Sequence, residues 1–314
     1  MENLIFCLNA TIPIFFTLLL GYFFRRIGLF DDAFVSRMNK FVFVAALPVL
    51  LFQDIAQVDI YKVWDLKMVI FCFVITSLSI TISVLLSLFL HPSDIRGEFI
   101  QASYRSSAAI LGIAVIQNLY ENAGMAPLMI IASVPLYNVM AVVVLSVFKP
   151  GQGRLDRTAL KKTLKGIVTN PIILGIAAGM VWSLLRFPFP KILDSTVGNL
   201  AKTATPLGLM AMGGSLRFGK AFSRLKASVV CTFMKLVGYE ALFLPLAISR
   251  GFTRDKLVSI IIMLGSASTV SCFVMAKNMD HEGSFTSGVV LLTTLLSSFT
   301  LTFWLFICRN LGLV

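Results

Sequence analysis

The sequence carries little charge and has little hydrophilic chain. Only 13% of its 314 residues are charged and 57% are hydrophobic, whereas ordinary soluble domains carry roughly 25% charged residues. This composition excludes a soluble globular protein. A membrane helix takes about 20 apolar residues, so ten spans need roughly 200 positions and leave only short connections. The chain therefore has no room for a separate soluble domain.

Cysteine and histidine are scarce, and the motifs of common cofactor sites are missing. The two histidines and five cysteines form no CxxC pair and no cluster at metal-ligand spacing, so neither a disulfide framework nor a metal site is predicted. The absence of a GxxxxGK[ST] loop disfavours an ATP-driven pump, and no cofactor is expected. No Lys or Arg precedes the first apolar run, which predicts a retained first span rather than a signal peptide.

Apolar runs between charged or Gly/Pro-rich breaks predict ten transmembrane helices. The spans cover residues of about 10–24, 38–56, 66–90, 98–119, 126–148, 168–186, 196–216, 227–248, 256–279 and 284–308. The runs are too long for buried strands and lack the alternation of a membrane barrel. The predicted fold class is therefore an all-α integral membrane protein.

The basic residues are distributed unevenly over the predicted connections. Of the 27 Lys and Arg, 17 lie in the odd-numbered connections, nine lie in the even-numbered ones and the C-terminus, and Lys235 lies inside span eight. Cytoplasmic loops collect basic residues, which predicts that both termini are non-cytoplasmic in the cell membrane. The formal charge of +12 thus describes orientation, and no nucleic-acid partner is expected.

The two halves of the chain resemble each other at an offset of 158 residues. Thr11, Pro13, Ile14, Gly21, Ala46, Pro48 and Leu51 reappear as Thr169, Pro171, Ile172, Gly179, Ala204, Pro206 and Leu209. Each half holds five spans, so the second half enters the membrane from the opposite side. The sequence predicts two inverted five-helix repeats, 1–148 and 168–314, joined by a cytoplasmic linker at 149–167. This architecture recurs in secondary transporters.

Spans four and nine are rich in small hydroxyl residues at mid-membrane depth. The residues that stand out are Ser106, Ser107 and Gly112 in span four and Gly265, Ser266 and Ser268 in span nine. Small residues permit close helix crossing, and an unwound segment there would expose amide groups and helix ends to an anion. Composition alone favours ordinary packing and anion binding equally.

Residues 38–52 (MNKFVFVAALPVLLF) closely resemble the second span of the auxin efflux carrier family, which includes bacterial malonate and malate permease-like proteins and plant PIN carriers. Residues 21–30, 207–216 and 273–277 resemble other parts of that family. The resemblance implies a ten-helix inverted-repeat carrier whose broken helices four and nine cross at the substrate site. This sequence departs from the family where Ser107 replaces an Asn, where a proline is missing after Gly112, and where another is missing near Ser266.

Two polar residues in the predicted spans are candidates for substrate binding. Arg105 lies seven residues into span four, close to the serine cluster, and an intramembrane cation is costly unless it has a partner or a water-filled cavity. We predict that it pairs with a substrate carboxylate; the alternative is a side chain that snorkels to the cytoplasmic boundary. Asn138 in span five is a second binding candidate, with interhelical hydrogen bonding as its alternative.

Three charged residues are candidates for coupling transport to an ion gradient. Lys235 and Glu240 lie five apart in span eight, about 140° round an α-helix, so they are not ideally placed to pair with each other. Glu240 is the main candidate for a proton-carrying carboxylate, and a structural pair with a neighbouring helix is its alternative. Asp54, at the end of span two, is a weaker candidate.

Together these features predict a secondary carrier that moves a small organic anion by alternating access and is linked to protons. A channel or a non-transporting sensor on the same scaffold is the main alternative. An integral-membrane lipid enzyme is disfavoured, because no nucleophile or metal constellation stands out in the sequence. The expected partners are the anion, protons and membrane lipids, and a homodimer is left open.

Overall fold

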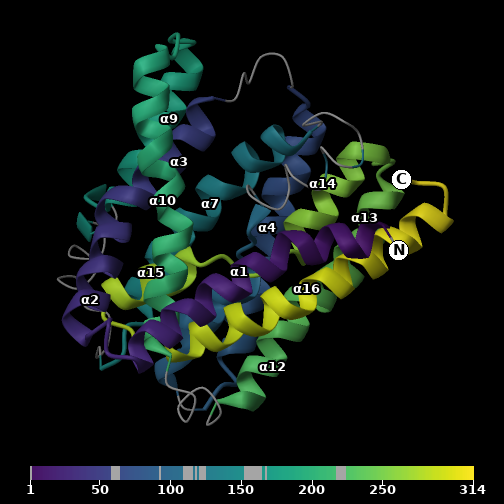
Figure 1. Cartoon of the computed structure of the whole chain (residues 1–314). Coiled ribbons are helices and arrows are strands. Elements are labelled where there is room, and N and C mark those ends of the chain that lie inside the picture. The colour runs from purple at the N-terminus through teal and green to yellow at the C-terminus, as the bar shows by residue number, and fades with distance from the viewer. Residues whose placement is uncertain are drawn as a thin grey trace.

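The computed structural model describes residues 2–57, 64–91, 93–108, 116, 119, 125–151, 165–166, 168–216 and 224–314 (Figure 1). Every regular element in these ranges is a helix, which confirms the predicted all-α class. Most of the predicted linker 149–167, and Gly112, lie outside the described residues.

The first half of the chain forms helices whose starts are set by local capping. Its elements are α1 (Glu2–Arg26), α2 (Asp32–Phe41), the π-helix η1 (Val42–Ala46), α3 (Leu47–Ala56), α4 (Leu66–Ser87), the short 3₁₀ helix η2 (Ser93–Ile95), α5 (Arg96–Tyr104) and α7 (Ala126–Val147). Asp31 caps α2 by accepting from the Phe34 amide at 2.6 Å, and Asp65 caps α4 through the Met68 amide at 3.1 Å. Such caps satisfy amides that have no partner within the helix.

The second half contains α9 (Pro171–Leu185), α10 (Lys191–Ser215), α12 (Leu225–Phe233), the π-helix η3 (Met234–Gly238), α13 (Tyr239–Ser249), α14 (Arg254–Gly265), α15 (Ser271–Asn278) and α16 (Ser284–Asn310). Asn170 caps α9, and Pro171 takes its first position, where the missing N–H costs nothing. The buried Glu98 carboxylate of α5 accepts from the Gly283 and Thr286 amides, both at 2.9 Å. This contact fixes the start of α16 against α5.

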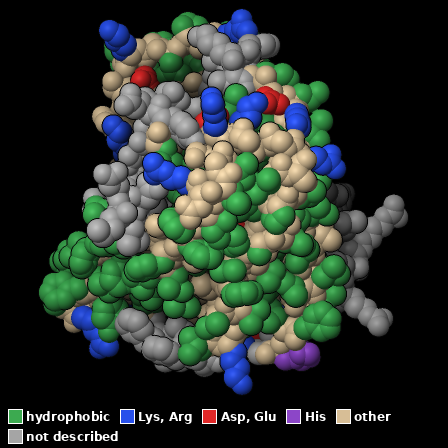
Figure 2. Space-filling view, turned by 90° about the vertical axis from the view of Figure 1, so that its right-hand side faces the viewer, with side chains coloured by type: hydrophobic (Ala, Val, Ile, Leu, Met, Phe, Trp, Pro, Cys, Tyr) green, Lys and Arg blue, Asp and Glu red, His purple; other side chains and the backbone are tan. Residues whose placement is uncertain are grey.

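Within the described residues, five helical segments are long and apolar enough to cross a membrane. They are Asp32–Ala56, Leu66–Ser87, Ala126–Val147, Leu225–Ser249 and Ser284–Asn310. These segments overlap the second, third, fifth, eighth and tenth predicted spans. Figure 2 shows hydrophobic side chains spread over a broad band of one face, with Lys and Arg mainly above and below it. That distribution suits a surface surrounded by lipid.

A first group of helices consists of α1, α3, α9 and α10. These helices pack in two pairs whose backbones approach each other closely. Helix α1 runs along α10, and α3 runs along α9. A side chain on Gly21 of α1 would overlap the Met210 backbone of α10, and one on Gly179 of α9 would overlap the Phe52 backbone of α3. Gly175, which forms a GxxxG pair with Gly179, lies against the backbone of α3 in the same way. The pair therefore serves helix packing, as small residues do in membrane bundles.

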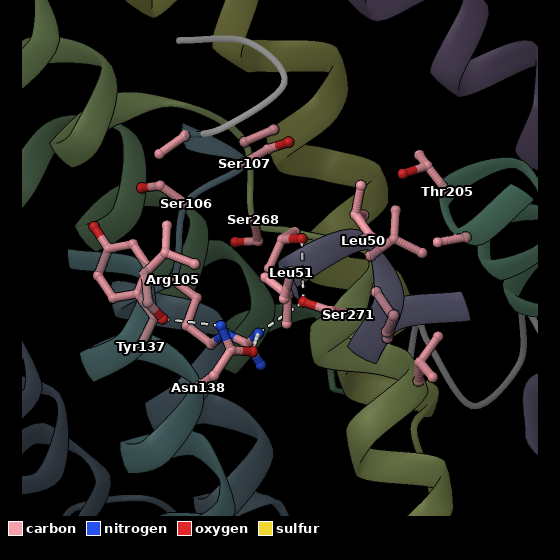
Figure 3. Close-up of a pocket in the computed structure, with 18 of the residues that line it drawn as sticks. Leu50, Leu51, Arg105, Ser106, Ser107, Tyr137, Asn138, Thr205, Ser268 and Ser271 are labelled. Carbon is pink, nitrogen blue, oxygen red and sulfur yellow. Dashed lines mark hydrogen bonds between the residues drawn. The ribbon is translucent and has the colours of Figure 1, made fainter. Parts of the chain in front are cut away.

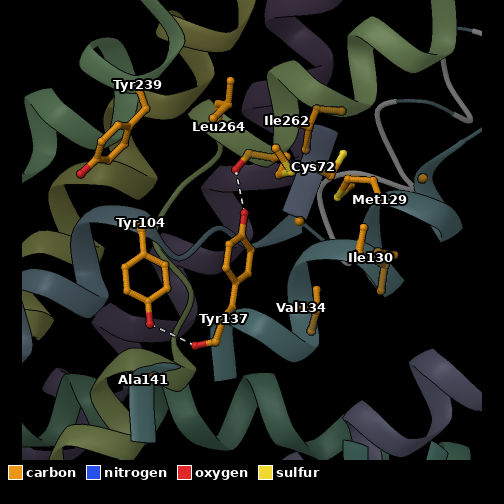
Figure 4. Packing of buried hydrophobic residues seen from close by; sticks show 14 of the residues in the cluster. Cys72, Tyr104, Met129, Ile130, Val134, Tyr137, Ala141, Tyr239, Ile262 and Leu264 are labelled. Carbon is orange, nitrogen blue, oxygen red and sulfur yellow. Dashed lines mark hydrogen bonds between the residues drawn. The ribbon is translucent and has the colours of Figure 1, made fainter. Parts of the chain in front are cut away.

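A second group consists of helices α4, α5, α7, α12, α13, α14 and α16, and a large buried cluster extends through it into α3, α9 and α10. Helix α4 packs on α5 and α7, and α16 packs on α12, η3 and α14. Tyr104 and Tyr137 lie in this cluster (Figure 4): the Tyr104 hydroxyl donates to the Tyr137 carbonyl at 3.1 Å, and the Tyr137 hydroxyl donates to the Met263 carbonyl at 3.2 Å. The two tyrosines link α5, α7 and α14.

Candidate functional site

Two helices break where they meet in the second group. Helix α5 ends at Tyr104 and the chain continues through Arg105 in an extended conformation (φ −76°, ψ 133°). Helix α14 ends at Gly265, and Ser266 is also extended (φ −71°, ψ 160°) before α15 begins at Ser271. The Ser107 amide donates to the Ala267 carbonyl at 2.9 Å, so the two breaks touch. Predicted spans four and nine are therefore interrupted without the family's prolines.

Serine hydroxyls stabilise each break by bonding to the other helix. Ser106 donates to the Met263 carbonyl in the last turn of α14, and Ser268 donates to the Ala102 carbonyl in the last turn of α5 at 2.7 Å. The last carbonyls of a helix have no partner within it, and a buried carbonyl without a partner is costly. The predicted serine cluster thus contributes to the structure of the crossing itself.

A cavity lies between this crossing and the helices of the first group (Figure 3). Its apolar wall comes from α1, η1, α3 and α10, and its polar wall comes from the crossing and α7. The polar residues that line it are Asp54, Arg105, Ser106, Ser107, Tyr137, Asn138, Thr205, Ser268, Thr269, Ser271 and Thr294. The described lining residues therefore offer one cation and many hydroxyl groups to a small molecule.

Arg105 lies in the cavity wall and is 1% exposed. One of its terminal nitrogens donates to Asn138 Oδ1 at 2.8 Å and to Ser271 Oγ at 2.7 Å, as Figure 3 shows. The other donates to Gln101 Oε1 at 3.2 Å and to the Met275 sulfur at 2.9 Å. All four partners are neutral, and Nε has none among the described residues. The side chain does not snorkel to a boundary.

Two further features of the cavity influence which charge a bound molecule can carry. Thr269 and Ser271 lie at the start of α15, where the positive end of the helix dipole favours an anion. Asp54 of α3 lies on the opposite wall and is the one carboxylate among the described lining residues. An anion bound beside Arg105 would therefore share the cavity with an acidic side chain.

Lys235 and Glu240 lie away from this cavity, next to the end of α14. Both side chains are fully buried. The Lys235 ammonium donates to Ser106 Oγ at 2.5 Å and to the Leu264 carbonyl. A side chain on Gly265 would overlap the Glu240 carboxylate, whose two oxygens have no hydrogen-bond partner in the described part of the chain. The 140° separation assumed an α-helix, but η3 is a π-helix, in which residues five apart lie on one side.

The structure gathers most of the predicted site residues but not all of them. Arg105, Ser106, Ser107, Asn138, Ser268 and Asp54 line the cavity. Gly265 and Ser266 lie at the break without lining it. Sequence reasoning missed Thr205, Thr269, Ser271 and Gln101. Ser271 stood in the same serine run as Ser266 and Ser268, so that run was its signal.

An all-helical bundle with apolar spans and a polar cavity at a helix break has the features of a membrane transport protein. A profile of the membrane transport protein family matches residues 6–305, and the chain belongs to this family. The resemblance to the auxin efflux carrier family is thereby confirmed.

Two curated relatives cover nearly the whole chain. A protein of Rhizobium meliloti named "putative malonate transporter" is 24% identical over 96% of each chain. A protein of Methanothermobacter thermautotrophicus named "uncharacterized transporter" is 20% identical over 94% of this chain and 96% of its own. The similarity therefore extends over both halves of the molecule.

Proposed function

We propose that this protein is a secondary carrier for small dicarboxylates and that Arg105 binds the substrate. The observation that carries the proposal is a buried guanidinium in a cavity wall whose hydrogen-bond partners in the described residues are all neutral. A buried cation is costly without a counter-charge. A carboxylate that enters the cavity supplies that charge and accepts a charge-assisted hydrogen bond.

The rest of the cavity favours a substrate with two carboxylates. The Ser107 and Thr269 hydroxyls line the same cavity as Arg105, so a second acidic group has hydrogen-bond partners of its own. The name of the Rhizobium meliloti relative includes malonate, which makes malonate the first substrate to test.

Alternating access between two inverted repeats, residues 1–148 and 168–314, is the mechanism we propose. The support is a pair of exchanged contacts: Gly21 approaches Met210, and Gly179 approaches Phe52. Gly179 lies 158 residues after Gly21, and Met210 lies 158 residues after Phe52. Each contact is therefore the counterpart of the other under the repeat, and the cavity lies between the two helix groups that would move relative to each other.

Proton linkage fits the presence of Asp54 in the same cavity as Arg105. An ionised Asp54 would repel an incoming dianion, whereas a protonated one would not. Substrate and proton would therefore bind together. Glu240 is the second candidate, because its carboxylate is buried beside the crossing, although it does not line the cavity.

We place the chain in the cell membrane with both termini on the outside. Helices α1 and α16 pack together, and Figure 1 shows the two termini at the same end of this pair. The excess of Lys and Arg in the odd-numbered connections puts those connections in the cytoplasm.

Transport of labelled malonate into proteoliposomes tests the proposal. We expect saturable uptake that is accelerated by malonate preloaded inside the vesicles, because a carrier exchanges its substrate. Arg105→Gln should lower uptake by about tenfold or more, since a charged hydrogen-bond partner contributes about 1.5–3 kcal/mol. Arg309→Gln, which removes an exposed arginine, is the matched control and should transport normally.

Three results would contradict the proposal. Uptake that never saturates would indicate a channel, and the absence of uptake of any dicarboxylate would argue against transport. Normal uptake by Arg105→Gln would exclude the binding role.

For coupling, an inward proton gradient should stimulate the wild type but not Asp54→Asn. Equal stimulation of both proteins would remove Asp54 from the mechanism.

A further inference from the structure

The Lys235 ammonium caps the broken end of α14. The π-helix η3 places this side chain, which has no exposed surface, against the break. Its nitrogen donates to the Leu264 carbonyl and, at 2.5 Å, to Ser106 Oγ. One side chain therefore joins the end of α14 to the chain that follows α5.

The oxygen atoms around this nitrogen are of the kind that bind a monovalent cation. The carbonyl end of a helix carries partial negative charge. In transporters with broken helices, such ends and unwound carbonyls coordinate sodium or protons. Here the Leu264 carbonyl and the Ser106 hydroxyl surround the ammonium, and the Glu240 carboxylate lies beside Gly265 with no hydrogen-bond partner among the described residues. These oxygen atoms therefore form a buried site that favours a cation, and the Lys235 ammonium occupies it.

We propose that Lys235 is a tethered cation that takes the place of a coupling sodium ion at the crossing. Glu240 supplies the compensating charge, and the crossing keeps its anion-binding geometry with no metal ion bound. The inference rests on the proposed function only in assigning the anion site to the crossing. It adds that anion binding is independent of sodium and that the cation site belongs to the chain itself.

A pair of substitutions separates a cation role from mere space filling. Lys235→Ala removes both the charge and the side-chain volume, and it leaves Leu264, Ser106 and Glu240 around an open space. Lys235→Met removes the charge but fills the same space with an apolar side chain. A small cation can enter the first variant and is excluded from the second.

The experiment measures the Tm of all three proteins in detergent, in sodium chloride and in choline chloride at equal ionic strength. We expect the wild type to be unchanged by sodium and Lys235→Ala to be stabilised by about 3 °C or more, because an ion that binds only the folded state raises its stability. Lys235→Met should be destabilised in both salts alike. Malonate affinity of the wild type should agree between the two salts within about twofold.

Each outcome decides the proposal. Sodium-dependent stability or malonate binding in the wild type would overturn it, as would a Lys235→Ala protein that responds to sodium no more than Lys235→Met does. If Lys235→Ala can be purified only in sodium, the proposal is supported; if it can be purified in neither salt, it is contradicted. A wild type that binds no dicarboxylate would refute the proposed function, while the sodium response of Lys235→Ala, measured without any anion, would still test Lys235.

Discussion

Two buried cations lie at the same helix crossing, and their surroundings differ. Arg105 lines a cavity and donates to neutral side chains, whereas Lys235 is enclosed and donates to a serine hydroxyl and a backbone carbonyl, with the Glu240 carboxylate nearby. Both positive charges are costly to bury. In the described residues, a carboxylate therefore lies near Lys235, whereas Arg105 lines the cavity and has no charged hydrogen-bond partner. We infer that Lys235 stabilises the site and that Arg105 binds the substrate.

The largest expected effect is on the stability of the ligand-free protein. Lys235→Met should lower the free energy of unfolding by about 3 kcal/mol or more, because it removes the buried donor at the end of α14 and leaves the Glu240 carboxylate without a cation nearby. Arg105→Met, in contrast, removes a charge that has no internal counter-charge and should cost less than half as much. Thermal unfolding in detergent checks both. Equal losses of unfolding free energy in the two variants would show that the two buried cations do not differ in their contribution to stability.

A double substitution tests whether the stability contributed by Lys235 depends on Glu240. Glu240→Gln in the Lys235→Met background should restore about 1–3 kcal/mol of the lost stability, because neither member of the pair is then charged. The same Glu240→Gln change in the Arg105→Met background should restore nothing. Thermodynamic cycles from the wild type, the three single variants Lys235→Met, Arg105→Met and Glu240→Gln, and the two double variants measure the coupling. A coupling near zero between Lys235 and Glu240 would show that the two residues act independently.

A smaller effect is expected from the residues that orient Arg105. Ser271→Ala removes an acceptor 2.7 Å from the guanidinium and should weaken malonate binding by about five- to tenfold, the equivalent of one hydrogen bond. Its Tm without ligand should change little. Ser249→Ala, at an exposed serine in α13, is the control. Unchanged affinity in Ser271→Ala would show that the guanidinium keeps its orientation without this partner.

The smallest effect concerns an ion pair outside the membrane spans. The hydrogen bond from Lys256, 2.5 Å from the carboxylate, holds the pKa of Asp65 below its ordinary value. Stabilisation is therefore present above the unfolded-state pKa of about 3.9 and is lost as the pH falls through the lower folded-state pKa. Asp65→Asn should cost under about 1 kcal/mol near neutral pH, and the difference from the wild type should shrink towards pH 3. A constant difference would assign the loss to the helix cap instead.

Much of the fold follows from simple patterns in the sequence. Apolar runs predicted the helices, because spans in lipid must satisfy their own backbone hydrogen bonds. The serine-rich segments marked where α5 and α14 break, and the rarity of charge singled out Arg105, Lys235 and Glu240. These signals are local, so a single sequence carries them.

The features that were missed depend on packing between distant segments. Thr205 and Ser271 are ordinary hydroxyl residues until α10 and α15 bring them to one cavity. The π-helix η3 changes the register between Lys235 and Glu240, and an assumed α-helical period cannot show it. The sequence favours Glu240 over Asp54 as the proton-carrying carboxylate, because it does not reveal which carboxylate shares a cavity with Arg105.

Calorimetric titration of malonate into the purified protein measures directly whether Arg105 binds a dicarboxylate. We expect malonate to bind to the wild type and to Arg309→Gln, acetate to bind more weakly, and the neutral malonamide not to bind. Arg105→Gln should lose affinity for malonate by about 30-fold or more, the equivalent of about 2 kcal/mol. Binding of malonate to Arg105→Gln with the wild-type affinity would exclude Arg105 as a substrate-binding residue.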